Sequence, residues 1–212
     1  MKIGNTQPQA GYKIDFSRID NPVEALLIPP VDFAAVSSGK DAESMKGTVN
    51  AGGDSFQFSV STAKGYNYTY KGKTTPTTIE NTAPGVNTLQ GQLGESPFRL
   101  DVESKMGAIG ISGQAGDMAV DETITLNPAA IMFGGALMTS EGTIGGLEYE
   151  EKFYLADNNT MVSQGHLGEM EINRVFSEDE NENKIIKGNI GDTEIDECIV
   201  FDPQEEKRAK AA

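Results

Sequence analysis

A six-residue pattern, x-x-Gly-x-apolar-Gly, recurs along the chain from residue 89 onward. It occupies residues 89–94, 111–116, 140–145, 163–168 and 186–191. The second glycines of these segments are separated by 22, 29, 23 and 23 residues, and the longest gap contains an insertion around residues 127–138. A period of this length indicates an array of repeated supersecondary units.

Apolar positions extend each repeat beyond its second glycine. Four residues after that glycine stand Phe98, Val120, Tyr149, Ile172 and Ile195, and eight residues after it stand Val102, Ile124, Phe153, Phe176 and Ile199. A spacing of four fits one face of a strand as well as one face of a helix. We favour strands, because these residues are mostly β-branched or aromatic and two glycines per unit would weaken a helix by about 1 kcal/mol each.

Each repeat unit therefore predicts a β-hairpin. The entering strand carries the first glycine and the apolar residue, the second glycine lies in the turn, and the returning strand carries the two later apolar positions. We expect the first glycine to be covered by a large side chain from a neighbouring strand. Looser copies at residues 47–50 and 66–70 would extend the array to about residues 45–201.

These patterns divide the chain into three parts. Residues 46–201 form the predicted hairpin domain, residues 1–45 an extended N-terminal arm, and residues 202–212 a charged C-terminal tail. Within the arm, Asn21 followed by Pro22 is typical of a helix start, and Pro29-Pro30 must end that helix. The fold class predicted is all-β, with serial antiparallel hairpins forming an open twisted sheet, a sandwich or an up-and-down barrel.

The overall charge narrows the classes of partner. The chain has 32 acidic and 17 basic residues, for a net charge of −15. Such a charge repels phosphate backbones, so we expect no nucleic-acid partner. The longest apolar stretch, residues 129–138, is too short to cross a bilayer, and the N-terminus lacks an apolar segment of signal-peptide length. We expect a soluble protein without membrane insertion, and slightly favour the cytoplasm.

Few residues could support catalysis or hold a cofactor. The single histidine, His166, stands at a repeat position that other units fill with varied polar residues, so we interpret it as a solvated strand residue. The single cysteine, Cys198, has no basic partner nearby in the sequence. One histidine and one cysteine cannot make a usual zinc site, and no phosphate-binding loop is present. We predict no catalytic residues, no cofactor and no bound metal.

Acidic residues are abundant and often occur in adjacent pairs. The pairs Asp121-Glu122, Glu150-Glu151 and Asp196-Glu197 occupy equivalent repeat positions, which favours a solvated face over a single glycosidase-type site. The segment 179–183 matches the start of a calcium loop. Lys184 and Ile190 replace the glycine and the acid that such a loop requires, so the loop is incomplete.

Two functions remain open from the sequence. The first is a non-enzymatic structural or assembly protein that forms a homo-oligomer or binds a protein partner, with the apolar insertion at residues 129–138 as the contact patch. The second is a barrel that carries a small apolar ligand. Against a wholly apolar interior stand four polar residues that should face the same side as the core positions: Glu122, Glu151, Arg174 and Glu197.

Overall fold

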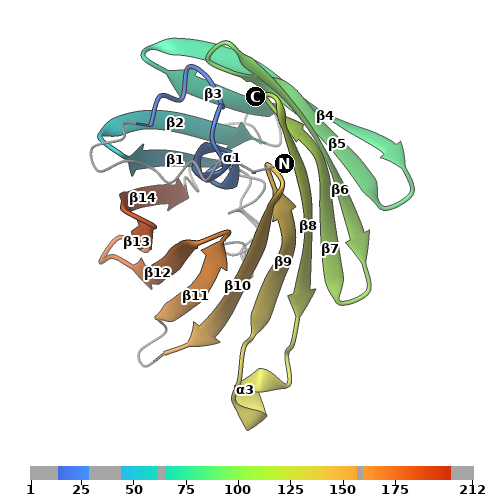
Figure 1. The fold of residues 1–212 in the computed structure, drawn as a ribbon, viewed down its shortest axis with the longest axis vertical. Coiled ribbons are helices and arrows are strands. Elements are labelled where there is room, and N and C mark those ends of the chain that lie inside the picture. Colours follow the sequence, from blue (N-terminus) through green and yellow to red (C-terminus); the bar gives the residue numbers. More distant parts are fainter. Residues whose placement is uncertain (1–13, 29–43, 62–64, 157–159, 202–212) are drawn as a thin grey trace, which may run out of the picture.

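The computed structural model describes residues 14–28, 44–61, 65–156 and 160–201. Fourteen antiparallel strands follow one another around a closed barrel (Figure 1). Their bounds are β1 Ser44–Ala51, β2 Asp54–Ser61, β3 Gly65–Tyr70, β4 Lys73–Ala83, β5 Val86–Leu93, β6 Ser96–Lys105, β7 Ala108–Ala115, β8 Met118–Leu126, β9 Met138–Ile144, β10 Leu147–Leu155, β11 Met161–Leu167, β12 Met170–Glu178, β13 Lys184–Ile190 and β14 Thr193–Phe201. The two described helices are α1, Pro22–Leu26, and α3, Ala130–Phe133. The prediction of an all-β hairpin meander is confirmed.

The barrel closes because the first strand pairs with the last. β1 and β14 run antiparallel, from Met45 opposite Phe201 to Ala51 opposite Ile195. Every other strand pairs with its neighbours in sequence. Among the three arrangements left open by the sequence, the structure is the up-and-down barrel, and closure leaves no free sheet edge among the described strands.

The second glycine of each repeat lies in a hairpin turn, as predicted. These glycines have φ values between 55° and 61°, a region that is costly for residues with a Cβ atom. In the last four repeats the N–H group of this glycine also donates to the preceding hairpin at 2.7–2.8 Å, for example from Gly168 to the Glu148 carbonyl and from Gly191 to the Glu171 carbonyl. The turns therefore tie successive hairpins together at one end of the barrel, called here the glycine-turn end.

The first glycine of each repeat is closely covered, by side chains in some units and by backbone in others. In two cases an added Cβ would meet side chains: the Phe58 ring at Gly47, and Thr77 and Phe98 at Gly91. In four others it would meet backbone of the preceding hairpin, such as the Glu150 carbonyl oxygen at 1.9 Å from Gly165. The four are Gly113, Gly142, Gly165 and Gly188. At these four positions the prediction of side-chain cover is wrong, because it is strand backbones that approach closely there.

The looser repeat copies also form hairpins. Gly47 lies in β1, which pairs with β2, and residues 66–70 lie in β3, which pairs with β4. The repeat apolar positions point inward, because the five at the fourth position are all buried, with 1–3 % of their surface exposed. Of those at the eighth position, Val102 is only partly buried.

Residues 14–28 enter the barrel and are called here the plug. An eight-stranded barrel is filled by its own side chains, whereas one of 16–18 strands leaves a channel, so fourteen strands leave room for added chain. The plug supplies eight buried apolar side chains, none more than 4 % exposed. They are Ile14, Phe16, Ile19, Val23, Ala25, Leu26, Leu27 and Ile28. Figure 1 shows α1, the helix of the plug, inside the ring of strands.

The plug is fixed against the glycine turns. The Glu95 N–H donates to the Ser17 carbonyl at 2.6 Å, and the Ile19 N–H donates to Ser96 Oγ at 2.9 Å. An added Cβ at Gly94 would lie 2.3 Å from Ser17 Cα, so a side chain there has no space. The predicted arm is thus, over residues 14–28, an internal part of the core. Residues 1–13, 29–43 and 202–212 of the predicted arm and tail lie outside the described residues.

The helix α1 begins and ends as its sequence predicts. The Asn21 side chain accepts a hydrogen bond from the Glu24 N–H at 3.1 Å, and Pro22 occupies the first turn. The helix ends at Leu26, ahead of Pro29-Pro30. Its residues from Val23 to Leu26 are buried, including Glu24.

Candidate functional site

A group of polar side chains lies inside the barrel, between layers of apolar ones. Its centre is Glu151 on β10, with 0 % of its surface exposed, and Arg174 on β12, with 2 % exposed. Arg174 Nε donates to Glu151 Oε1 at 2.9 Å and Arg174 Nη2 donates to Oε2 at 2.5 Å. Tyr149 and Ser163 also donate to this carboxylate. We call these four residues the polar cluster.

The carboxylate of Glu151 is fully occupied. Each of its oxygens accepts two hydrogen bonds, which is the capacity of a carboxylate oxygen. Burial, followed by the Glu151 charge, raises the pKa of Tyr149 well above its ordinary value, so this phenol keeps its proton and donates. An acid or base that acts on a substrate needs a free lone pair or proton, and Glu151 offers neither. The arrangement is that of a structural ion pair.

The paired acids of the repeats are split between the two sides of the wall. The first member of each pair, such as Asp121 or Glu150, faces outward, whereas the second, such as Glu122 or Glu151, is buried inside. Glu122 accepts a hydrogen bond from Ser140 on the neighbouring strand β9. The interpretation as a solvated face is therefore wrong for the second member, because side chains alternate along a strand. The expectation that Glu122, Glu151, Arg174 and Glu197 share the inner face is confirmed, since all four are at most 2 % exposed.

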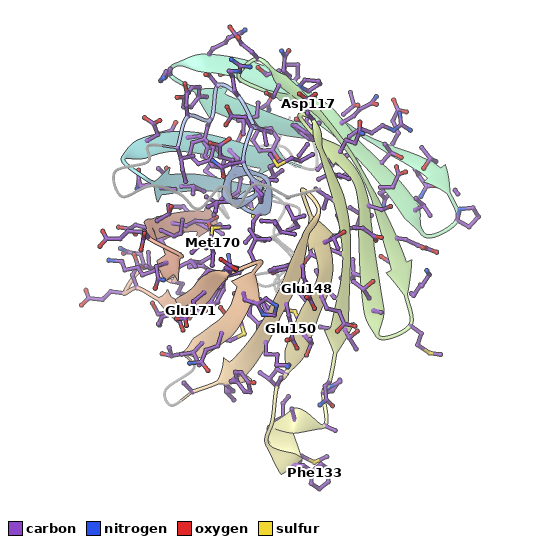
Figure 2. The ribbon with its side chains drawn as sticks, in the orientation of Figure 1. Asp117, Phe133, Glu148, Glu150, Met170 and Glu171 are labelled. Atoms are coloured by element: carbon purple, nitrogen blue, oxygen red, sulfur yellow. The ribbon has the colours of Figure 1, made fainter. Side chains whose placement is uncertain are left out.

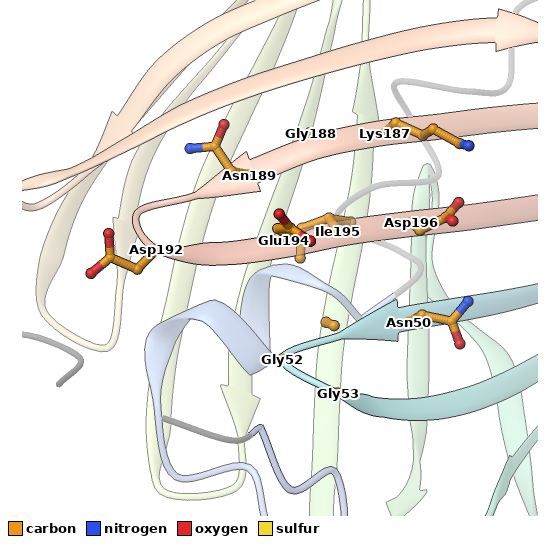
Figure 3. Close-up of a pocket in the computed structure, with 11 residues that line it drawn as sticks. Asn50, Gly52, Gly53, Lys187, Gly188, Asn189, Asp192, Glu194, Ile195 and Asp196 are labelled. Carbon is orange, nitrogen blue, oxygen red and sulfur yellow. The ribbon is translucent and has the colours of Figure 1, made fainter. Parts of the chain in front are cut away.

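Two hollows lie on the outer wall at repeat glycines. One, of about 780 Å³, lies over the ends of β1, β13 and β14 near Gly188 (Figure 3). Its side chains include Asp192, Glu194 and Asp196, with Lys187 as its lysine. The other, of about 590 Å³ near Gly142, is lined by acids of β8, β9 and β10. Both are open and carry mostly acidic side chains, so neither resembles an enclosed apolar ligand pocket.

The outward face also holds His166. It lies half-buried on β11, opposite Glu150 on one neighbouring strand and Glu171 on the other. Lys152 forms an ion pair with Glu150 beside it. Among the described residues, no group of three or more His, Cys, Asp or Glu side chains is placed to hold a metal ion.

Cys198 lies on β14 and is half-buried. Burial, and after it the nearby charges of Asp179, Asp196 and Glu197, raise the pKa of its thiol. An activated thiol requires the opposite shift, so the surroundings of Cys198 oppose nucleophilic chemistry.

The acidic loop at residues 179–183 binds its own backbone. Asp179 Oδ1 accepts hydrogen bonds from the N–H groups of Asn181 at 2.8 Å and Asn183 at 2.9 Å. Asp179 Oδ2 accepts from Asn183 Nδ2 at 2.8 Å. These bonds, the Asn183 side chain first, lower the pKa of Asp179. The loop is an Asx turn between β12 and β13 whose first carboxylate is engaged in the turn itself.

The insertion between β8 and β9 forms a projecting hook, defined here as residues 127–137, a range that includes α3. Ile131, Met132 and Phe133 are 70 %, 76 % and 82 % exposed. In Figure 2, Phe133 stands at the tip of α3, away from the strands. When consecutive residues of one element expose large apolar side chains, that element usually belongs to a contact surface.

The base of the hook is well anchored. The Asn127 N–H donates to the Leu137 carbonyl at 2.7 Å, and the Leu137 N–H donates to the Phe153 carbonyl at 2.8 Å. Within it, the Phe133 N–H donates to the Ala129 carbonyl and the Gly134 N–H to the Ala130 carbonyl. The apolar side chains therefore project from a defined backbone, which lowers the entropic cost of binding.

Comparison of the chain with protein-family models, with curated proteins and with solved structures finds no match. Within the described residues, none of the helices is long and apolar enough to cross a membrane. What the chain does must therefore be argued from its own residues.

Proposed function

We propose that this protein is a non-enzymatic structural or assembly protein, a β-barrel scaffold that associates with protein through its hook. The observation that carries the proposal is the exposure of Ile131, Met132 and Phe133 at the tip of α3. Burying three such side chains would contribute several kcal/mol to association, at about 1.5–3 kcal/mol for each.

The surroundings of the hook support the same role. From residue 123 to residue 140 the sequence contains no Asp, Glu, Lys or Arg, although 23 % of the chain is charged. A surface that must lose its water on binding avoids charged residues at its centre. Glu151 also agrees with a non-enzymatic role, since all four lone pairs of its carboxylate accept hydrogen bonds within the polar cluster.

The route of association differs from strand addition. Sheet edges are the usual sites at which β proteins pair with other chains, but β1 and β14 are paired with each other. Association through the hook needs no free edge. It leaves the barrel unchanged and uses the part of the array that departs from the repeat.

The test is the particle mass by light scattering across a concentration series. Phe133→Asp should hold the protein at the monomer mass at concentrations where the unaltered chain forms larger particles or binds its partner. The matched control is Ile79→Asp, which adds the same charge at a residue on β4 that is 47 % exposed. If both variants and the unaltered chain had the same particle mass at every concentration, the hook would not be the contact surface.

The second candidate is a carrier of a small apolar ligand, which barrel closure favours. The plug side chains and the charged Glu151–Arg174 pair occupy part of the interior, and this counts against it. Solvent extraction of protein purified from its source decides between the two. A stoichiometric apolar molecule in the extract would favour the carrier.

A further inference from the structure

The methionines of this chain differ in their exposure. The chain has eight of them, and all but Met1 lie in the part that the structure describes. Among these described methionines, only Met106 and Met132 are exposed. A solute in the surrounding water therefore reaches these two side chains first. The others are buried or half-buried in the barrel: Met45, Met118, Met138, Met161 and Met170.

The two exposed methionines have different surroundings. Met106 occupies the β6–β7 turn, next to the charged Lys105. Met132 lies in α3 between two exposed apolar residues, within the stretch from residue 123 to residue 140 that contains no Asp, Glu, Lys or Arg. A new polar group at Met106 would join a surface that already carries charge. At Met132 it would interrupt the apolar surface of the hook.

The backbone around Met132 is fixed, although its side chain is exposed. The N–H groups of Met132 and Phe133 both donate to the Ala129 carbonyl at 3.0 Å. The base of the hook is tied to β10 by the bond from the Leu137 N–H to the Phe153 carbonyl. A chemical change at the Met132 sulfur therefore alters the surface of the hook and leaves its backbone hydrogen bonds in place.

From these observations we propose that Met132 is an oxidation site, at which a peroxide switches off association through the hook. The inference rests on the proposed function and names its regulation. The thioether sulfur attacks one oxygen of hydrogen peroxide, so that an S–O bond forms and the O–O bond breaks. The other oxygen leaves as water with both protons. The sulfur is oxidised to a sulfoxide while the peroxide is reduced.

The product changes what the hook can bury. A thioether is apolar, whereas a sulfoxide is polar and accepts hydrogen bonds. Removing such a group from water without a hydrogen-bond partner is unfavourable, and the apolar contribution of the side chain is lost as well. Full burial of one methionine corresponds to an association constant about 10- to 100-fold larger. We therefore expect oxidation of Met132 to weaken association by about this factor.

Association and oxidation oppose each other at this residue. In an associated particle the hook contacts protein, so Met132 is covered and peroxide reacts with the dissociated chain. Once the sulfoxide has formed, it hinders renewed association. Met106 lies outside the hook and keeps its exposure in both states. The rate of oxidation at Met132, compared with that at Met106, therefore reports whether the hook is occupied.

The experiment follows oxidation residue by residue in the full chain. A Cys198→Ser background is used so that no thiol consumes the oxidant. Hydrogen peroxide is added across a series of protein concentrations, and peptide mass spectrometry measures the sulfoxide at each methionine. Met132 and Met106 should be oxidised before the methionines of the barrel. As the concentration rises and particles form, the rate at Met132 should fall, while that at Met106 stays constant.

Light scattering then measures the consequence for association. Oxidation should raise the concentration of half-association about 10- to 100-fold. Met132→Leu keeps an apolar side chain of similar size, so this variant should associate equally before and after peroxide. The matched control Met106→Leu should lose association as the unaltered chain does. Reduction by a methionine sulfoxide reductase with a thiol reductant should restore the particle mass.

The outcomes separate this inference from the proposed function. Association that survives complete oxidation of Met132 would overturn the inference and leave the hook as the contact surface. An equal loss of association in Met132→Leu and Met106→Leu after peroxide would place the responsible oxidation elsewhere, and would overturn it as well. A chain that stays monomeric at every concentration before oxidation would contradict both proposals.

Discussion

The plug and the hook are both apolar segments outside the hairpin repeat, yet the barrel treats them in opposite ways. Phe16 of the plug is 0 % exposed and packs on Phe56 at a ring-centroid distance of 4.4 Å, whereas Phe133 of the hook is 82 % exposed. α1 has an asparagine cap, and α3 has no side-chain cap at Ala129. The difference shows that apolar sequence alone does not determine burial. The plug fills a wide barrel with large side chains, whereas the buried residue of α3 in the hook is the small Ala130.

Matched phenylalanine variants should show the largest contrast. Phe16→Ala removes a buried ring and should lower the free energy of unfolding by about 3–5 kcal/mol. Phe133→Ala removes an exposed ring and should change it by less than about 0.5 kcal/mol in the dissociated chain. Guanidinium unfolding at low protein concentration measures both. If the two variants lost similar free energies of unfolding, the buried ring of Phe16 would stabilise the fold no more than the exposed ring of Phe133 does.

Two turn glycines separate the cost of backbone strain from the cost of displacing the plug. Gly94 and Gly72 both have positive φ, 61° and 77°, so alanine at either should cost about 1–2 kcal/mol through its Cβ. An added Cβ at Gly94 also meets Ser17 of the plug, whereas at Gly72 nothing lies within 4 Å. Gly94→Ala should therefore cost about 1–3 kcal/mol more than Gly72→Ala. Equal unfolding midpoints would place the plug away from this turn.

A third test of the comparison is the pH dependence of the plug. Desolvation by burial raises the pKa of Glu24 from 4.5 to about 7. Between these values the folded chain holds a proton that the unfolded chain releases, so stability falls as the pH rises from about 4.5 to 7. The loss should be about 3 kcal/mol, at about 1.36 kcal/mol for each pKa unit.

Glu24→Gln should remove this part of the pH profile in denaturant titrations. The pKa of Asp15 is held below its usual range, first by the hydrogen bond from Tyr70 Oη, so its contribution to stability is lost only at more acidic pH. Parallel profiles for Glu24→Gln and the unaltered chain between pH 4.5 and 7 would contradict the assignment to Glu24.

Much of the fold could be predicted because its determinants are local. The turn at Gly168 needs a positive φ, and the inward positions Ile172 and Phe176 follow from alternation along one strand. Closure could not be predicted, because the pairing of β1 with β14 depends on the accumulated curvature of all fourteen strands. The position of the plug depends in turn on closure, since there is no interior to fill in an open sheet.

One candidate site could be recognised from the sequence, and another could not. The insertion at residues 129–138 could be identified because it interrupts a regular period. The Glu151–Arg174 ion pair was missed, although a signal was present: opposite charges occupy the same repeat position in successive hairpins, on the face shared with Tyr149 and Ile172. Like positions of neighbouring units lie side by side in a meander, so opposite charges there can pair. Whether they do depends on burial, which one strand does not reveal.

The pairing of β1 with β14 has a consequence for how the chain folds. Met45 and Phe201 are among the most distant described residues in sequence, yet they lie opposite each other. Contacts of such long sequence separation slow folding, because a large loop must close before they form. During synthesis the plug is made first, but it can reach its final surroundings only after the last hairpin has been added. Until then, the plug and the inner wall are exposed together, which makes the nascent chain prone to aggregation.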